Sequence, residues 1–188
     1  RIPVTAAAGA SLVFLGPVAL RGFREGLHLN QAALQGRISP KLLEELKAAA
    51  AVVADNPRTN FEVGENLRRL SFAGEAEWEA QAREAIAWLE KAQANNAHDP
   101  MVHVSLGLCW HWLAEPVKAR REFEKAMDIG PRNVAVANHY AWNLLQQGRV
   151  RAARAIFEES LTWNSWDNWF ARPHLDDILK GRWKEDPK

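Results

Sequence analysis

The chain has 188 residues and a formal net charge of +1, with a single cysteine and nine tryptophans. This length suits a domain with a substantial core, and the near-neutral charge argues against a nucleic-acid surface, which needs a pronounced basic patch. A lone cysteine forms no internal disulfide, so Cys109 is expected to be a buried small hydrophobe. We therefore predict a globular chain with no nucleic-acid partner.

The N-terminal residues are apolar. No charged residue lies between Ile2 and Leu20, and a helix of that length, at about 1.5 Å per residue, would match the roughly 30 Å hydrocarbon core of a bilayer. A signal-peptide core and a buried helix are the alternatives, because prolines and glycines interrupt the run. We predict a transmembrane and juxtamembrane helix over residues 1–36, with Arg21 and Arg24 at the membrane interface.

Two helix-start signals follow the apolar N-terminal run. Ser39-Pro40 opens an amphipathic helix that we expect to cap the domain, and Asn56 as N-cap with Pro57 opens another that reaches about Leu70. Gly64 is the small residue expected where this second helix crosses its partner, a helix near Glu79–Asn95. The apolar positions of the capping helix recur at three- and four-residue steps: Leu42, Leu43, Leu46, Ala49, Ala50 and Val53.

A spacing motif occupies the segment from Pro100 to Pro131. It reads His103-x2-Leu106-Gly107-x2-Trp110, then Ala119-x3-Phe123-x2-Ala126, and ends in Pro131. This is the tetratricopeptide spacing with histidine in place of the usual leading tryptophan. Two antiparallel helices pack closely in such a unit, so Gly107 must stay small where the backbones cross while Phe123 fills the space beside it.

The period of about 34 residues continues on both sides of this motif. Downstream, the matching positions are Ala137, Tyr140, Ala141, Leu144, Ala153, Phe157 and Ser160. Upstream, they are Ala85, Leu89 and Ala92. The chain breaks at Arg172-Pro173, after which a short helix, His174–Leu179, is expected to cover the end. We predict an all-α fold, a tetratricopeptide helical-hairpin superhelix of about three repeats plus capping helices, over residues 37–188.

Catalytic motifs are missing from the sequence. There is no phosphate-binding glycine loop, no Gly-x-Ser-x-Gly elbow and no Cys-x-x-Cys pair, and His103 and His111 do not have metal-ligand helical spacing. We expect no catalytic residue, no metal and no cofactor in this chain.

The repeat register instead predicts a partner-binding groove on the concave face of the first helices. Its lining would be apolar and aromatic, which favours an apolar helix or peptide segment of another protein over a free carboxylate. The alternative, that the capping helix or the C-terminal tryptophan-rich segment fills the groove, stays open. The predicted groove residues are Met101, Val104, Leu108, His111, Trp112, Asn138, Trp142 and Leu145.

Several runs of residues resemble one family more closely than the repeat class. They are Asn60-Phe61-Glu62-Val63-Gly64-Glu65-Asn66-Leu67-Arg68, Leu70-Ser71-Phe72-Ala73-Gly74, Leu106-Gly107-Leu108-Cys109-Trp110-His111-Trp112-Leu113 and Trp166-Asp167-Asn168. Together they resemble the C-terminal region of bacterial O-antigen ligase/polymerase-like membrane proteins. The resemblance implies a last transmembrane helix, a tetratricopeptide domain with an insertion in its first repeat, and a context of surface-glycan assembly.

From these observations we predict a membrane-tethered scaffold that binds a protein partner. Membrane contact would be through Ile2–Leu20, at the bacterial inner membrane, and the resemblance implies that the repeats lie in the periplasm. Arg21 and Arg24 follow the apolar run and only Arg1 precedes it, which favours the opposite orientation, so the side stays open. The alternatives are an accessory structural subunit of a large membrane complex and the non-catalytic tail of a glycan-transferring ligase. Whether the chain is a piece of such an enzyme stays open.

Overall fold

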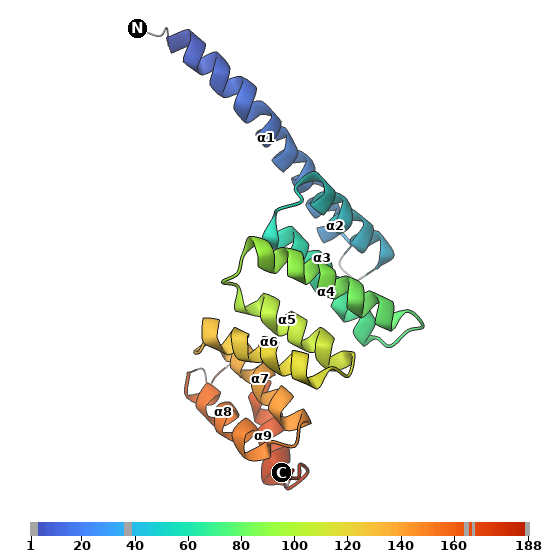
Figure 1. Cartoon of the computed structure of the whole chain (residues 1–188), viewed down its shortest axis with the longest axis vertical. Coiled ribbons are helices and arrows are strands. Elements are labelled where there is room, and N and C mark those ends of the chain that lie inside the picture. Colours follow the sequence, from blue (N-terminus) through green and yellow to red (C-terminus); the bar gives the residue numbers. More distant parts are fainter. Residues whose placement is uncertain (1–3, 36–38, 164–165, 167, 187–188) are drawn as a thin grey trace. The chain divides into compact units, whose positions relative to one another are not determined.

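The computed structural model describes residues 4–35, 39–163, 166 and 168–186, with side chains from residue 17 onward. Every regular element in this part of the chain is a helix (Figure 1). The helices group into two compact units, Arg1–Asn95 and Asn96–Lys188. The all-α class predicted from the sequence is therefore confirmed.

The first unit contains α1 (Val4–Ala33), α2 (Pro40–Val52), α3 (Pro57–Phe72) and α4 (Trp78–Asn95). The predicted start signals of α2 and α3 are confirmed. The Ser39 hydroxyl accepts a hydrogen bond from the backbone N–H of Leu42 at 3.1 Å, and the side-chain oxygen Oδ1 of Asn56 accepts one from the backbone N–H of Arg58 at 3.0 Å. Each cap satisfies a backbone donor that the helix itself leaves unpaired.

Helices α3 and α4 form the first hairpin, and Gly64 lies at their crossing as predicted. A Cβ atom on Gly64 would stand 2.7 Å from Leu89 Cγ and 3.2 Å from the carbonyl oxygen of Ala85. No larger side chain fits there without moving α4. The surrounding core is aliphatic, with buried Leu46, Ala49, Ala50, Val63, Leu67, Ala82, Ala85, Ile86 and Leu89.

The N-terminal helix differs from the prediction. Among the described residues, no helix is long enough and apolar enough for a membrane crossing. Much of the stretch from Val4 to Leu20 is alanine and glycine, which contribute little apolar surface, and α1 continues without a break into Arg21, Arg24 and Glu25. The predicted transmembrane helix over Ile2–Leu20 is therefore wrong, and so is the membrane-anchored, periplasmic location that depended on it. Ile2 and Pro3 themselves lie outside the described residues.

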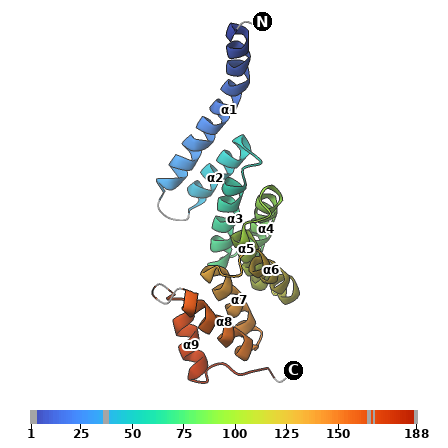
Figure 2. The ribbon, with the colours of Figure 1, turned by 90° about the vertical axis from the view of Figure 1, so that its left-hand side faces the viewer.

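The C-terminal half of α1 packs within the first unit. Helices α1 and α2 lie side by side, as Figures 1 and 2 both show. Ala32 is buried, and so is the carboxylate-bearing residue Glu25, which reaches the start of α3. This part of α1 is thus an element of the helical unit. The predicted domain boundary between residues 36 and 37 lies outside the described residues and stays a prediction.

The second unit contains α5 (Pro100–Trp112), α6 (Pro116–Ile129), α7 (Val134–Gln146), α8 (Val150–Trp163) and α9 (Ala171–Leu179). The first four form the two predicted hairpins, α5 with α6 and α7 with α8. The final helix begins at Ala171 and not at the predicted His174. Pro173 falls in its first turn, where a proline removes no helical hydrogen bond.

Gly107 and Phe123 form the predicted crossing of the second hairpin. A Cβ atom at Gly107 would stand 2.8 Å from Phe123 Cε2, and the Phe123 side chain is fully buried. Around this pair lies a core of Val104, Ala119, Ala126 and Val136. The last hairpin and α9 share a second core of Ala141, Leu144, Leu145, Val150, Ala153, Phe157, Ala171 and Leu175.

Candidate functional site

The predicted groove residues do not all reach the surface. Val104 and Leu145 are buried, 1% and 0% exposed, in the two cores of the second unit. Their side chains contact the protein's own helices. The repeat spacing correctly places these residues on the first helices of the hairpins. It does not show which of them pack inward against the next hairpin.

Asn138 is buried as well, and it is held by a polar network. Its Nδ2 donates to Asn168 Oδ1 at 2.7 Å, and its Oδ1 accepts from the Ser160 hydroxyl at 2.9 Å. Asn168 Nδ2 donates in turn to Ser160 Oγ at 2.9 Å. Because buried amides are costly unless paired, this network ties α7 and α8 to the segment before α9. Asp167, which precedes Asn168, lies outside the described residues.

The other predicted residues stay partly exposed: Met101, Leu108, His111, Trp112 and Trp142. We refer to these five as the α5–α7 surface. The two first helices α5 and α7 contact each other directly. Met101 and Leu108 pack on the core around Phe123, while their outer atoms remain accessible.

Two aromatic rings meet on the α5–α7 surface. The centroids of His111 and Trp142 are 4.7 Å apart, with an interplanar angle of 67°. Burial lowers the pKa of His111 below its ordinary value of 6.5, so the imidazole is neutral at pH 7. An uncharged imidazole packed against an indole leaves a partly buried aromatic surface without a fixed charge, which suits an apolar side chain of a ligand.

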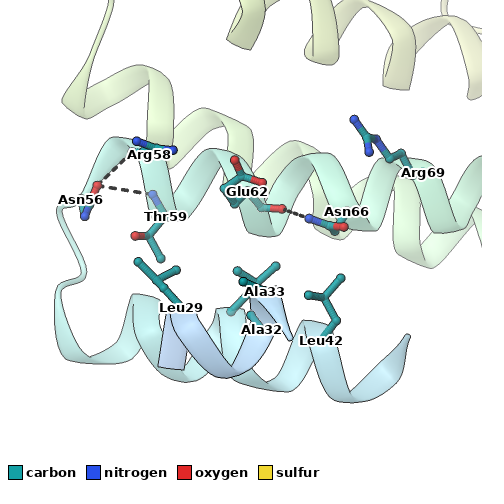
Figure 3. A pocket seen from close by; sticks show the side chains of 11 residues that line it. Leu29, Ala32, Ala33, Leu42, Asn56, Arg58, Thr59, Glu62, Asn66 and Arg69 are labelled. Atoms are coloured by element: carbon teal, nitrogen blue, oxygen red, sulfur yellow. Dashed lines mark hydrogen bonds between the residues drawn. The ribbon is translucent and has the colours of Figure 1, made fainter. Parts of the chain in front are cut away.

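A separate hollow lies in the first unit, between α1, α2 and α3 (Figure 3). Its volume is about 450 Å³, which is room for one or two side chains of a ligand. Figure 3 shows apolar side chains of α1 and α2 facing polar side chains of α3. We call this hollow the α3 pocket. Its apolar floor is Leu29, Ala32, Ala33, Leu42 and Leu46, and its polar wall is Asn56, Arg58, Thr59, Glu62, Asn66 and Arg69.

The end of the α3 pocket is fixed by Glu25 of α1. Glu25 Oε1 accepts hydrogen bonds from Asn56 Nδ2 at 2.7 Å and from the Thr59 hydroxyl at 2.6 Å. The carboxylate also lies at the N-terminus of α3, where the helix dipole favours a negative charge. Sequence reasoning missed this pocket because it assigned α1 to a membrane. The signal was available: Glu25, Leu29 and Ala32 recur at four- and three-residue steps along one face.

The second helices carry charged outer faces. His103 Nδ1 and Lys125 Nζ each contact the Glu122 carboxylate, at 2.7 and 2.8 Å. Burial raises the pKa of Glu122, but the hydrogen bonds and the charge interactions with His103 and Lys125 together outweigh burial and hold the pKa below its ordinary value of 4.5. On α8, Arg154 pairs with Glu158 at 2.7 Å across one turn. The Arg154–Glu158 pair is solvated, whereas the side chains of His103 and Glu122 are only 4% and 14% exposed.

The described residues contain no group of three or more histidine, cysteine, aspartate or glutamate side chains that could hold a metal ion. Cys109 is buried, as expected for a small core residue. The candidate sites in the described part of the chain are the α3 pocket and the α5–α7 surface.

Comparison with known proteins assigns the fold. No protein-family model matches the chain, and no curated protein matches it. Solved structures do match: TTC0263, a thermophilic TPR protein of Thermus thermophilus, is 20% identical with a TM-score of 0.72, over 83% of this chain and 80% of that chain.

Two crystal structures of the protein MamA are similar as well. One is 12% identical with a TM-score of 0.61, over 85% of this chain and 88% of that chain. The other is 20% identical with a TM-score of 0.54, over 66% and 68% of the two chains. At such identities the likeness concerns the fold alone, and it agrees with the helical hairpins described above. The chain has a tetratricopeptide-repeat fold.

Proposed function

We propose that this chain is a non-catalytic protein-interaction module that binds an apolar segment of another protein. The observation that carries the proposal is the α5–α7 surface. On it, His111, Trp112 and Trp142 are partly exposed on two adjoining first helices. Aromatic anchors supply most of the binding energy in such interfaces.

A selection of random peptides against the purified chain supplies ligands for the test. For a selected peptide, Trp112→Ala should weaken binding at least about tenfold, or roughly 1.4 kcal/mol, with the helical circular-dichroism signal intact. Trp166→Ala is the matched control, because Trp166 is 91% exposed and lies outside the surface. Equal losses in the two variants would remove the α5–α7 surface from the proposal.

The α3 pocket supports a second contact point for the same class of ligand. A peptide could place one apolar side chain on the floor and its polar backbone against the α3 wall. Leu42→Gln should weaken such binding, whereas Leu43→Gln should not. Both residues are half-buried leucines of α2, and only Leu42 lines the pocket. If neither variant changes the affinity for the peptide, the α3 pocket takes no part and binding is restricted to the α5–α7 surface.

The context of surface-glycan assembly rests only on the residue runs that resemble O-antigen ligase-like proteins. Among these runs, Gly64, Gly107 and Asn168 have packing roles in this structure. Such roles are compatible with any repeat protein of this fold. The glycan context therefore stays a hypothesis, and a genetic test is the loss of O-antigen ligation in a strain that lacks the chain.

A further inference from the structure

Helix α1 carries an apolar stripe that stays uncovered in the described part of the chain. Its members are spaced by three, four and seven residues, and all are exposed: Leu20 56%, Phe23 64%, Leu27 47% and Leu34 76%. Leu34 belongs to the same helical run, because its N–H donates to the carbonyl oxygen of Asn30 at 3.1 Å. We call these four residues the α1 stripe.

The stripe lies on the face of α1 away from the first unit. At about 100° per residue, its members fall within roughly 60° of one another around the helix axis. The residues that α1 buries against its own unit, Glu25 and Ala32, fall on the other side of the helix. One face of α1 is therefore occupied by α2 and α3, and the other face presents a ridge of large apolar side chains.

The spacing matches a coiled-coil seam. Leu20, Leu27 and Leu34 repeat every seven residues, and Phe23 follows Leu20 by three residues. These are the a and d positions of a coiled coil, at which the side chains of two helices interlock. A convex ridge on a single helix offers no hollow for a short extended peptide. It does fit a second helix with the same ridge.

The residues on the two borders of the stripe favour pairing with an identical helix from a second copy of the chain. Small exposed residues, Ala19, Gly26 and Ala33, follow one border at seven-residue intervals, so two backbones can approach closely. The other border holds Arg24 and the neutral Gln31, so two identical copies do not align rows of like charges.

The exposed area is sufficient for a weak dimer. From the exposed fractions, the four side chains present roughly 350 Å² per copy, or about 700 Å² for a pair. The bordering residues bring the total close to the ~1,000 Å² that a specific interface needs. Because α1 is already folded against α2 and α3, association does not have to supply the free energy of forming the helix.

We propose that the α1 stripe is a self-association surface and that its partner is the stripe of a second copy of this chain. The interaction is concentration-dependent, as the modest area requires. The border of the stripe shares Ala33 with the floor of the α3 pocket, whereas no residue of the α5–α7 surface belongs to it.

Sedimentation equilibrium of the full chain over a range of concentrations tests the proposal. The wild type should pass from monomer to dimer as concentration rises, and Leu27→Glu should weaken the dimer at least tenfold. Val18→Glu is the matched control. Val18 is an exposed apolar residue of the same helix, 61% exposed, on the side away from the stripe, so this variant should dimerise like the wild type.

Leu34→Glu is the second variant in case Leu27→Glu disturbs the fold, since Leu34 is the most exposed member of the stripe. A wild type that stays monomeric at every concentration overturns the proposal, and so does equal weakening by Leu27→Glu and Val18→Glu. A monomeric wild type that binds phosphatidylcholine vesicles through Leu27 also overturns it, and assigns the stripe to a lipid surface.

Discussion

The contact between Gly107 and Phe123 sets the register of the second hairpin, and Gly107→Ala perturbs it with one methyl group. The new Cβ would lie 2.8, 2.9 and 3.0 Å from three carbons of the Phe123 ring. Optimal carbon–carbon separation is about 3.5–4.0 Å, so these distances are strongly repulsive. Phe123 is fully buried, and protein interiors are close-packed, so its ring has little freedom to move aside.

Two opposing terms determine the size of the effect. Overpacking a core by one methyl group costs about 1–3 kcal/mol, and replacing glycine by alanine inside a helix gains about 1 kcal/mol. We expect Gly107→Ala to lower the free energy of unfolding by about 1 kcal/mol. Gly22→Ala should have the opposite sign, because Gly22 lies in α1 and a Cβ atom added to it would meet no atom within 4 Å.

Urea unfolding followed by circular dichroism measures these differences, and Phe123→Leu completes a double-mutant cycle. Leucine lacks the ring atoms that the new methyl group would meet. The loss of unfolding free energy in the double variant should therefore be smaller, by about 1 kcal/mol or more, than the sum of the losses in the two single variants. Two results would refute the assigned packing of this hairpin. One is that the free-energy changes of Gly107→Ala and Phe123→Leu simply add, and the other is that Gly107→Ala stabilises the chain as much as Gly22→Ala is expected to.

Two further predictions concern carboxylates. Glu25→Ala should destabilise the chain by about 2–4 kcal/mol, because it removes the charged acceptor of two hydrogen bonds from Asn56 and Thr59. Glu25→Gln, which keeps an acceptor oxygen, should cost less in the same urea assay. The lowered pKa of Glu122 stabilises the fold fully above pH 4.5, and this contribution is lost as pH falls through the lower folded value. Glu122→Gln should therefore flatten the loss of stability between about pH 5 and pH 3, and an unchanged pH profile would contradict the role of its bond to His103.

Local sequence signals predicted the hairpins well because each signal has a local physical cause. Proline after an N-cap side chain marks the start of α2, α3 and α5, since both features act within one turn. The small residues Gly64 and Gly107 mark helix crossings, because close backbone approach excludes a larger side chain.

The same reasoning failed for α1, where the outcome depends on tertiary contacts. Lack of charge between Ile2 and Leu20 is a necessary condition for a membrane helix, but small side chains make the stretch too weakly apolar. The residues that reveal the role of α1 lie further along, where Glu25 pairs with Thr59 across 34 sequence positions. No local pattern predicts a contact over that separation.

The candidate site was predictable only in part. The repeat register placed His111 and Trp142 on adjoining first helices, and the structure brings their rings into contact. It could not show that Val104, Asn138 and Leu145 pack inward, because burial depends on which neighbouring helix covers each position. The α3 pocket requires three helices at once, and the sequence offers only one part of it, the spacing of Glu25, Leu29 and Ala32 along one face of α1.

The nine tryptophans provide the most direct test of the proposed binding surface. Each indole N–H gives its own resonance in a two-dimensional NMR spectrum, and assignment by single substitution identifies the peaks. On titration with a selected peptide, we expect the Trp112 and Trp142 resonances to shift, while those of the exposed Trp166 and Trp169 stay in place. Shifts confined to Trp166 and Trp169, with Trp112 and Trp142 unmoved at saturation, would show that the partner does not bind to the first helices α5 and α7.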